Sequence, residues 1–307
     1  MNPSTNAEPF LKWAGGKRQL LDQLSTHFPP GLESGQITRY AEPFVGGGAL
    51  LFHLLDRYTF DQVLIADVNR ELILAYRTVR RAVDPVIERL SGLESQYLAL
   101  DTEDRKAFYY EQRDRFNERL PEIDFTHFQR AWIERTATLI FLNRTCFNGL
   151  FRVNSKGEFN VPAGRYKNPT ICDDENLQRV SKALQNADIR QGDFTICRDF
   201  VDAQTFVYFD PPYRPISETS SFTSYAKGDF DDADQLRLAD FFQELDRIGA
   251  RLMLSNSDPK NVDPEDDFFE EAFAGYHIER VTANRMINSK AGGRGAITEL
   301  LITNYEM

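Results

Sequence analysis

The chain has 307 residues and a formal net charge of −11 at pH 7. This acidic balance argues against a protein that coats nucleic acid without sequence preference, because such binding needs basic surface against phosphates. No apolar run reaches the roughly 18 residues of a membrane-spanning helix, and the first residues lack the basic and apolar regions of a secretion signal. The three cysteines and four histidines show no ligand spacing, so we expect a cytoplasmic protein without disulfides or a metal site.

Residues 10–18, FLKWAGGKR, stand before an amphipathic stretch that predicts a helix. A Gly-Gly turn with Lys17 close to a helix start can hold a carboxylate through backbone N–H groups and a positive charge. Trp13 can form a wall of the same pocket. Taken alone, the segment is better explained by Trp13 in the core and Lys17 as a solvated side chain.

A glycine-rich turn, Val45-Gly46-Gly47-Gly48, follows a short strand at Tyr40-Ala41 and opens a helix. Glycines at such a place let a ligand approach the backbone closely. The next strand, 63–66, ends at Asp67, about twenty residues after the turn, where an acid hydrogen-bonds ribose hydroxyls in nucleotide-binding sheets. The alternative is that Asp67 caps the helix that begins near Asn69.

The middle of the chain, from residue 69 to 144, has a charged, helical pattern with few strand signals. Residues 145–170 are rich in Gly, Asn, Pro and aromatic residues, and the turn residues Asn154 to Gly157 predict a hairpin. Five basic residues and one acidic residue lie between Arg144 and Lys167, and a second basic stretch, 280–298, contains four basic residues and no acid. Both stretches favour contact with phosphates, although a solvated surface explains them as well.

The strand 205–209 is followed by Asp210-Pro211-Pro212-Tyr213. These four residues suit the transfer of a methyl group to an amine on an aromatic ring. Such an amine is a poor nucleophile, and its two N–H bonds need two acceptors, which the Asp210 carboxylate and the Pro211 carbonyl can supply. Tyr213 can stack on the aromatic ring that carries the amine. The alternative is a simple turn, but ligands of open α/β sheets bind beyond the carboxyl ends of strands.

Further apolar runs at 251–255 and 300–303 predict strands, and the pattern of 234–248 predicts a helix that ends at Gly249. Alternating strands and helices indicate an α/β sheet domain. We therefore expect a discontinuous sheet domain, 1–68 and 171–307, interrupted by a largely helical insertion, 69–170, that carries a β-hairpin. The acidic stretch 263–271 has no role that the sequence assigns.

These segments, taken in order, resemble the Dam-type, alpha-group (D12 class) adenine-N6 DNA methyltransferases. The resemblance covers nearly the whole chain and includes residues 142–144, 148–152 and 157–166, which look like that family's target-recognition hairpin. It implies a Rossmann-like methyltransferase fold, S-adenosylmethionine as methyl donor, and an adenine flipped out of double-stranded DNA. A monomer is the simplest expectation for an enzyme that modifies one strand at a time, and we expect it to be associated with the nucleoid. The target implied by these residues is GATC.

The resemblance also implies roles for single residues. The catalytic residues are Asp210, Pro211, Pro212 and Tyr213. The residues expected to bind the cofactor are Trp13, Lys17, Glu42, Pro43, Phe44, Gly46, Gly48, Asp67, Asp193, Phe194 and Asp210. The residues expected to bind DNA are Lys12, Arg144, Phe147, Asn148, Leu150, Arg152, Pro162 and Tyr166, with Arg152 as a guanine reader and Leu150 and Pro162 against a thymine methyl.

Three features leave alternatives open. Gly192-Asp193 is as often a plain turn as part of an adenine pocket. Thr145-Cys146-Phe147 stands where some relatives have a more tyrosine-rich segment, so Phe147 can stack between bases but cannot donate a hydrogen bond. The catalytic tetrapeptide contacts only the flipped base, so an RNA adenine methyltransferase is a second hypothesis, and a non-catalytic DNA-binding protein is a third.

Overall fold

The computed structural model describes residues 5–17, 20–215, 230–283 and 297–306. Three members of the second basic stretch, Arg285, Lys290 and Arg294, lie outside the described residues. The chain divides into two compact units. Unit 1 comprises Met1–Gly16, Gly46–Arg57 and Asn69–Gln191, and unit 2 comprises Lys17–Val45, Tyr58–Val68 and Gly192–Met307. The boundary expected between residues 68 and 69 coincides with one of these unit boundaries, whereas the one expected between 170 and 171 does not, and the two-domain division of the sequence analysis stays a prediction.

One mixed sheet holds the described strands in the order β3-β2-β1-β4-β5-β7-β6. Strand β1 is parallel to β2 and β4, β4 is parallel to β5, and β7 is antiparallel to both β5 and β6. The α/β fold class is thus confirmed. The strand bounds are β1 Arg39–Glu42, β2 Gln62–Asp67, β3 Ala187–Gln191, β4 Thr205–Phe209, β5 Arg251–Ser257, β6 His277–Ala283 and β7 Ile297–Thr303.

The five strands expected from apolar runs are all present, as parts of β1, β2, β4, β5 and β7. All five residues of β4 are buried, as expected of a strand covered on both faces. Strands β3 and β6 were not predicted. They lie at the two edges of the sheet and carry exposed polar side chains between their apolar ones, so they lack the continuous apolar run of a central strand.

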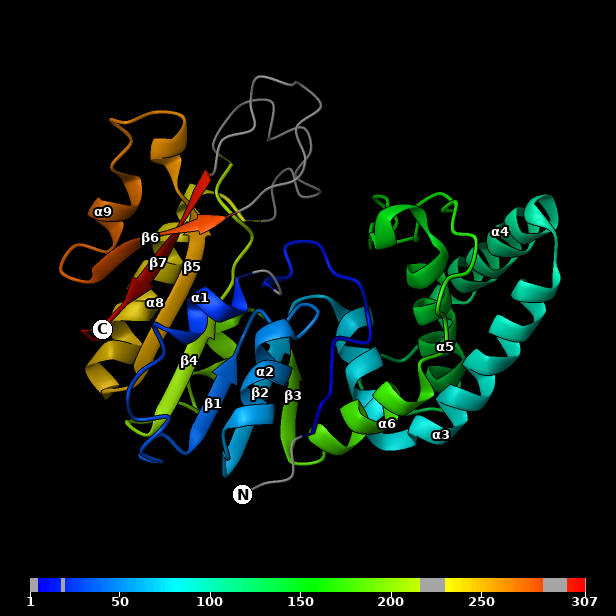
Figure 1. Ribbon diagram of the computed structural model, residues 1–307, viewed down its shortest axis with the longest axis horizontal. Helices are drawn as coiled ribbons and strands as arrows, with labels where there is room; N and C mark the ends of the chain where they lie inside the picture. Colours follow the sequence, from blue (N-terminus) through cyan, green and yellow to red (C-terminus); the bar gives the residue numbers. More distant parts are fainter. Residues whose placement is uncertain (1–4, 18–19, 216–229, 284–296, 307) are drawn as a thin grey trace. The chain divides into compact units, whose positions relative to one another are not determined.

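Helix α8, Asp232–Ile248, packs against the central strands of unit 2 (Figure 1), with Phe241 and Phe242 beside Phe209 of β4. Asp231 and Asp234 form a capping box at its start. Gly249 ends it in the left-handed conformation, with φ +92°, as the sequence predicted. The start of α8 is therefore fixed in place next to the end of β4.

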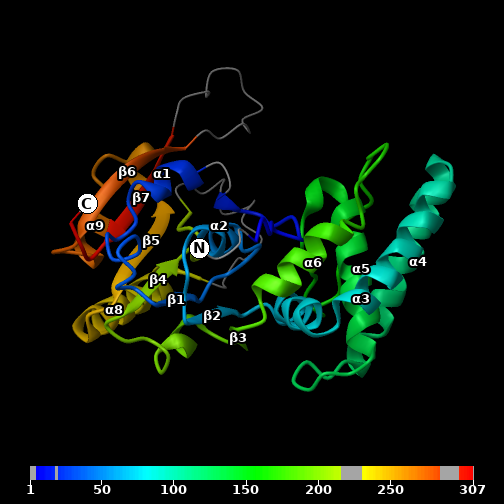
Figure 2. The ribbon, with the colours of Figure 1, turned by 60° about the horizontal axis from the view of Figure 1, so that its bottom comes forward.

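Unit 1 is largely helical, as expected for residues 69–144. Helices α3, α4 and α5 pack side by side (Figure 2), and α3 bends at Ala82, because the ring of Pro85 cannot follow the preceding turn. The helix bounds are α1 Leu21–Ser25, α2 Ala49–Arg57, α3 Arg70–Ala99, α4 Thr102–Glu118, α5 Ala131–Thr145, α6 Asp174–Ala183 and α9 Phe268–Ala272, with short 3-10 turns η2 Leu120–Glu122, η3 Phe147–Gly149, η4 Phe194–Cys197 and η5 Pro259–Asn261.

A buried ion pair joins these helices. The Arg135 guanidinium on α5 donates to both carboxylate oxygens of Glu71 on α3, at 2.7 and 2.5 Å, and to the backbone carbonyl of Phe116 on α4, at 3.0 Å. Its carbon also lies 3.9 Å from the centroid of the Phe116 ring. Three helices thus share one cation whose donors are largely satisfied.

The expected hairpin forms only in part. The turn is present, because the N–H of Gly157 donates to Asn154 O at 2.9 Å and the N–H of Asn154 donates to Glu158 O at 2.9 Å. Its flanks, however, make only isolated bridges, such as Val153 to Phe159. The Asn117 side chain on α4 accepts from the N–H of Phe159 at 2.8 Å and donates to its carbonyl at 3.0 Å. These backbone groups are therefore bonded to a helix side chain and do not extend a β-ladder.

Candidate active site

Acidic side chains gather at one edge of the unit 2 sheet. Glu42 ends β1, Asp67 ends β2, and Asp210 directly follows β4, and these three strands are parallel. Because carboxyl ends of parallel strands meet at one edge, this is where an open α/β sheet binds its ligands. The alternative that Asp67 caps the following helix is wrong, because the side chain of Asn69 caps α3 by accepting from the N–H groups of Glu71 and Leu72.

Lys17 lies at the centre of the site. Its side chain is 7 % exposed, and Nζ lies 3.1 Å from Asp210 Oδ1 and 3.4 Å from Glu299 Oε2. The ammonium also donates to the hydroxyl of Tyr213 and lies 4.1 Å from the centroid of its ring. The solvated alternative for Lys17 is therefore wrong.

Glu299 on β7 completes this cluster, and the sequence analysis did not identify it. Its Oε2 accepts a hydrogen bond of 2.7 Å from the Tyr213 hydroxyl. A carboxylate next to the apolar run 300–303 was the available signal, since a charged side chain beside a buried strand is kept where it has a partner. Two carboxylates thus share one ammonium, and the cluster has a net negative charge when both are ionised.

Burial raises the pKa of Asp210 to about 6; the Lys17 ammonium acts in the opposite direction, and the Glu299 carboxylate adds to the rise. The Asp210 side chain is 21 % exposed, so a substrate can still reach it. Burial, followed by the charges of Asp210 and Glu299, also raises the pKa of Tyr213 well above its usual value. At neutral pH the site therefore offers an ionised carboxylate as acceptor and a neutral phenol.

The glycine turn belongs to unit 1, and the protein itself fills the space beside it. Gly46 and Gly48 have φ values of +47° and +74°. A Cβ on Gly46 would lie 3.0 Å from a ring carbon of Trp13, and one on Gly48 would lie 2.6 Å from the hydroxyl of Tyr76. Trp13 also stacks on Phe151 at 5.4 Å. Both glycines are thus required by packing, whatever ligand approaches the turn.

The other expected cofactor residues of unit 2 differ in what they can offer. The Asp193 carboxylate is bound to Arg237 at 2.9 Å and accepts from the N–H of Thr195 at 3.0 Å. Phe194 is 1 % exposed, and its ring packs against Phe44 at 5.6 Å, within the core. Pro43, which precedes Phe44 in the chain, is buried as well. Contact of these residues with a cofactor stays a prediction.

The residues expected to bind DNA all belong to unit 1. The Asn143 side chain joins two of their segments: it accepts from the N–H of Lys12 at 2.8 Å and donates to the carbonyls of Lys12, at 2.9 Å, and Gly149, at 3.0 Å. Lys12 Nζ lies 4.5 Å from the ring centroid of Tyr166. Arg144 donates to the carbonyl of Phe10 at 2.9 Å.

Further along this surface, the Arg152 guanidinium donates to the side chain of Asn160 at 2.6 Å and to its backbone carbonyl at 3.1 Å, which holds the arginine in one orientation. Phe147 is 51 % exposed, and Asn148 next to it has a left-handed backbone, with φ +56°. Pro162 is exposed and Leu150 half-buried. The residues expected to bind DNA therefore include an arginine held in one orientation and an exposed aromatic ring.

No cluster of three or more His, Cys, Asp or Glu side chains able to hold a metal ion was found among the described residues. The described helices likewise include none long and apolar enough to cross a membrane.

A family model described as the D12 class N6 adenine-specific DNA methyltransferase matches residues 13–287. The chain is 54 % identical over 299 residues to the Type II methyltransferase M.MjaIII of Methanocaldococcus jannaschii, a match that covers 97 % of this chain and 99 % of the relative. It is 40 % identical over 302 residues to the Type II methyltransferase M1.LlaDCHI of Lactococcus lactis subsp. cremoris, covering 98 % and 96 %. It is 32 % identical over 302 residues to a DNA adenine methylase of Haemophilus influenzae, covering 98 % and 95 %. By these matches the chain belongs to the D12 class of N6 adenine-specific DNA methyltransferases.

Proposed function

We propose that this enzyme transfers a methyl group from S-adenosylmethionine to N6 of an adenine flipped out of double-stranded DNA, within GATC. The observation that carries the proposal is the environment of Asp210: a carboxylate at the end of β4, paired with Lys17 and followed by Pro211 and Tyr213. An acceptor of this kind suits an exocyclic amine, which has two N–H bonds to donate.

The residues of the site fit S-adenosylmethionine by charge. With Asp210 and Glu299 ionised, the cluster around Lys17 has one more negative than positive charge, and this ligand carries a single net positive charge. Lys17 would pair with the carboxylate of the ligand, and Asp67 would accept from its ribose hydroxyls. When bound, S-adenosylmethionine supplies the methyl group.

Three groups of the chain would act on the adenine. The Asp210 carboxylate and the Pro211 carbonyl would accept the two N6–H bonds, which favours the pyramidal amine whose lone pair can attack. Tyr213 would stack on the base and hold N6 in line with the methyl group. Because the pKa of Asp210 is about 6, its carboxylate is ionised and able to accept at neutral pH.

The GATC target rests on unit 1. Arg152, whose orientation is restricted by its bonds to Asn160, would make bidentate bonds to one guanine, since a guanidinium matches guanine O6 and N7 in the major groove. Leu150 and Pro162 would contact a thymine methyl. The exposed Phe147 ring would fill the space that the flipped base leaves in the stack.

The test is transfer of labelled methyl from S-adenosylmethionine to matched duplexes that contain GATC or the permuted sequence GTAC, with nucleoside analysis for N6-methyladenine. Label confined to the GATC duplex supports the proposal. Label on both duplexes would keep the chemistry and refute the target. Label on structured RNA alone, or none on any substrate, would refute the proposal as a whole.

A further inference from the structure

The backbone that carries the catalytic residues lies outside the regular hydrogen bonding of the sheet and the helices. Residues 210–215 follow β4 and belong to no helix or strand. Their peptide groups therefore depend on side chains for hydrogen bonds, because buried backbone groups are rarely left unpaired. How this short segment is held decides where Tyr213 and the Pro211 carbonyl point.

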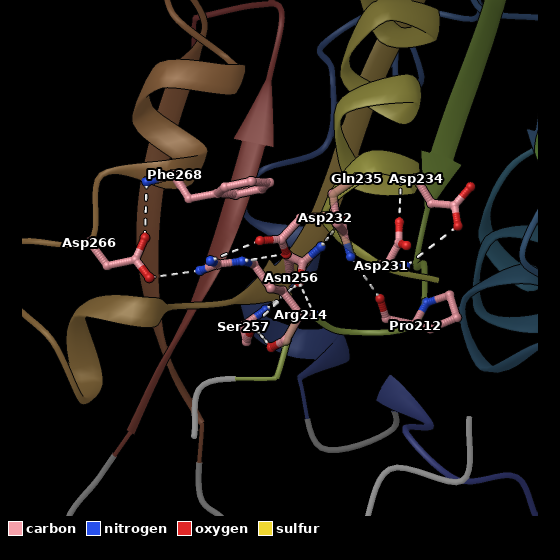
Figure 3. A network of polar contacts seen from close by, with 10 residues as sticks. All are labelled: Pro212, Arg214, Asp231, Asp232, Asp234, Gln235, Asn256, Ser257, Asp266 and Phe268. Atoms are coloured by element: carbon pink, nitrogen blue, oxygen red, sulfur yellow. Dashed lines mark hydrogen bonds and ion pairs between the residues drawn. The ribbon is translucent and has the colours of Figure 1, made fainter. Parts of the chain in front are cut away.

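Two buried amides take up this task (Figure 3). Gln235, in the first turns of α8, is 1 % exposed and donates from Nε2 to the Pro212 carbonyl at 3.0 Å. Asn256, on β5, is fully buried and accepts from the N–H of Arg214 at 3.1 Å. The amides also bind each other, since Asn256 Nδ2 donates to Gln235 Oε1 at 3.0 Å. The peptide groups on both sides of Tyr213 are thereby fixed.

The orientation of each amide is determined by its partners. Asn256 Oδ1 accepts from two backbone N–H groups, those of Arg214 and Ser257, the latter at 2.8 Å. Its Nδ2 must then face Gln235, so Gln235 turns its oxygen to Asn256 and its nitrogen to Pro212. A carboxylate in place of Gln235 would set an oxygen against the Pro212 carbonyl, whereas its protonated form would restore the donor.

The segment has a second anchor beyond Tyr213. The Arg214 guanidinium binds Asp232 at 2.8 Å and Asp266 at 2.7 Å and lies 4.3 Å from the ring centroid of Phe268. The Ser257 hydroxyl donates to the Arg214 carbonyl at 2.6 Å. Asp266 belongs to the acidic stretch that the sequence left without a role, and its place beside Arg214 gives it one (Figure 3).

We propose that Gln235 and Asn256 are positioning residues of the methyl-transfer site: together they fix the two peptide groups on either side of Tyr213 and thereby aim its ring at the adenine. This inference rests on the proposed function. Neither side chain touches the substrate. They act through the backbone, in the way that a supporting layer fixes a reactive group.

The test compares Gln235→Glu with a matched control, Asn304→Asp. Asn304 is also an amide bound to β5: it accepts from the N–H of Leu252 at 2.8 Å and donates to Asp246 and to the Ala250 carbonyl, at 2.6 and 2.8 Å. It serves the amino end of β5, whereas Asn256 lies near the carboxyl end. Both variants place a carboxylate in an amide site, so both are expected to melt at lower temperature.

The first readout is amide hydrogen exchange of the peptide that contains residues 210–215, in the protein without DNA. At pH 8, Gln235→Glu should accelerate exchange there on the order of tenfold, and Asn304→Asp should leave it unchanged. Unchanged exchange in Gln235→Glu would overturn the inference without reference to activity.

The second readout is single-turnover methyl transfer to duplex DNA. We expect Gln235→Glu to lose on the order of tenfold or more at pH 8 while its affinity for DNA stays within about threefold. The ratio of its rate to that of the wild type should rise as the pH falls and the carboxyl is protonated, and Asn304→Asp should keep the wild-type rate. Equal losses in both variants, or a ratio independent of pH, would overturn the inference, whereas an inactive wild type with the expected exchange pattern would instead refute the proposed function.

Discussion

The carboxylate pair around Lys17 makes Glu299→Gln an informative variant. Glu299 raises the pKa of Asp210, so its neutralisation should lower that pKa. Both carboxylates lie within 3.4 Å of the same Nζ, which puts their oxygens no more than about 7 Å apart. At an effective dielectric constant of about 20, two charges at that distance repel by about 2 kcal/mol. Burial is the largest cause of the raised pKa of Asp210, so this repulsion is an upper limit, and Glu299→Gln should lower that pKa from about 6 toward its usual value.

The assay is the pH dependence of kcat/KM for methyl transfer between pH 5 and 8. If ionised Asp210 is required, the wild type should retain about a tenth of its plateau rate at pH 5, and Glu299→Gln should retain a larger fraction of its own plateau rate. Tyr213→Phe serves as the control, because it removes the hydrogen bond to Glu299 but keeps both carboxylates. An acidic limb at the same pH in Glu299→Gln and the wild type would refute the coupling between the two carboxylates.

Three further predictions concern other parts of the molecule. Asp210→Asn should abolish turnover yet raise the free energy of unfolding at pH 8 by about 2 kcal/mol, measured by urea denaturation. Because burial raises the pKa of Asp210 to about 6 in the folded protein, ionisation of this carboxyl lowers the free energy of unfolding as the pH rises from about 4 to 6, and the neutral amide avoids that loss. Arg135→Ala should lower the free energy of unfolding by about 3–5 kcal/mol in the same assay, since it leaves Glu71 buried without its cation. Arg152→Ala should cost about 1–3 kcal/mol of discrimination at one base pair, measured as the ratio of kcat/KM on GATC and single-mismatch duplexes. A stable Arg135→Ala protein, a destabilised Asp210→Asn protein or an unchanged ratio for Arg152→Ala would each contradict its prediction.

The sequence predicts the strands and helices of this fold better than it predicts which side chains contact one another. Buried strands such as β4 leave a continuous apolar run, and Gly249 marks the end of α8, so both could be recognised locally. The ion pair between Lys17 and Glu299 could not be recognised locally, because these residues lie near opposite ends of the chain and come together only through the order of the strands.

The same limit applies to the residues around the catalytic segment. Gln235 looks like an ordinary polar residue of a helix, and only the fold places it against the Pro212 carbonyl. The sequence singles out the glycines of the turn as cofactor residues, which stays a prediction, and it does not show that Trp13 and Tyr76 crowd Gly46 and Gly48.

The order of the strands has a consequence for synthesis on the ribosome. Tyr40 of β1 pairs with Phe206 of β4, so the whole of α3, α4 and α5 is translated before β1 finds this neighbour. Until β3 and β4 are made, β1 and β2 have only each other as strand neighbours, and an isolated pair of strands is marginally stable. Because late pairing of distant strands slows folding and leaves sheet edges exposed, the nascent chain depends on its helical part folding first and on the sheet closing only after the C-terminal strands emerge. A protein cut after α6 would lack five of the described strands, β4 among them, and so would have no sheet at whose edge Asp210 could be placed.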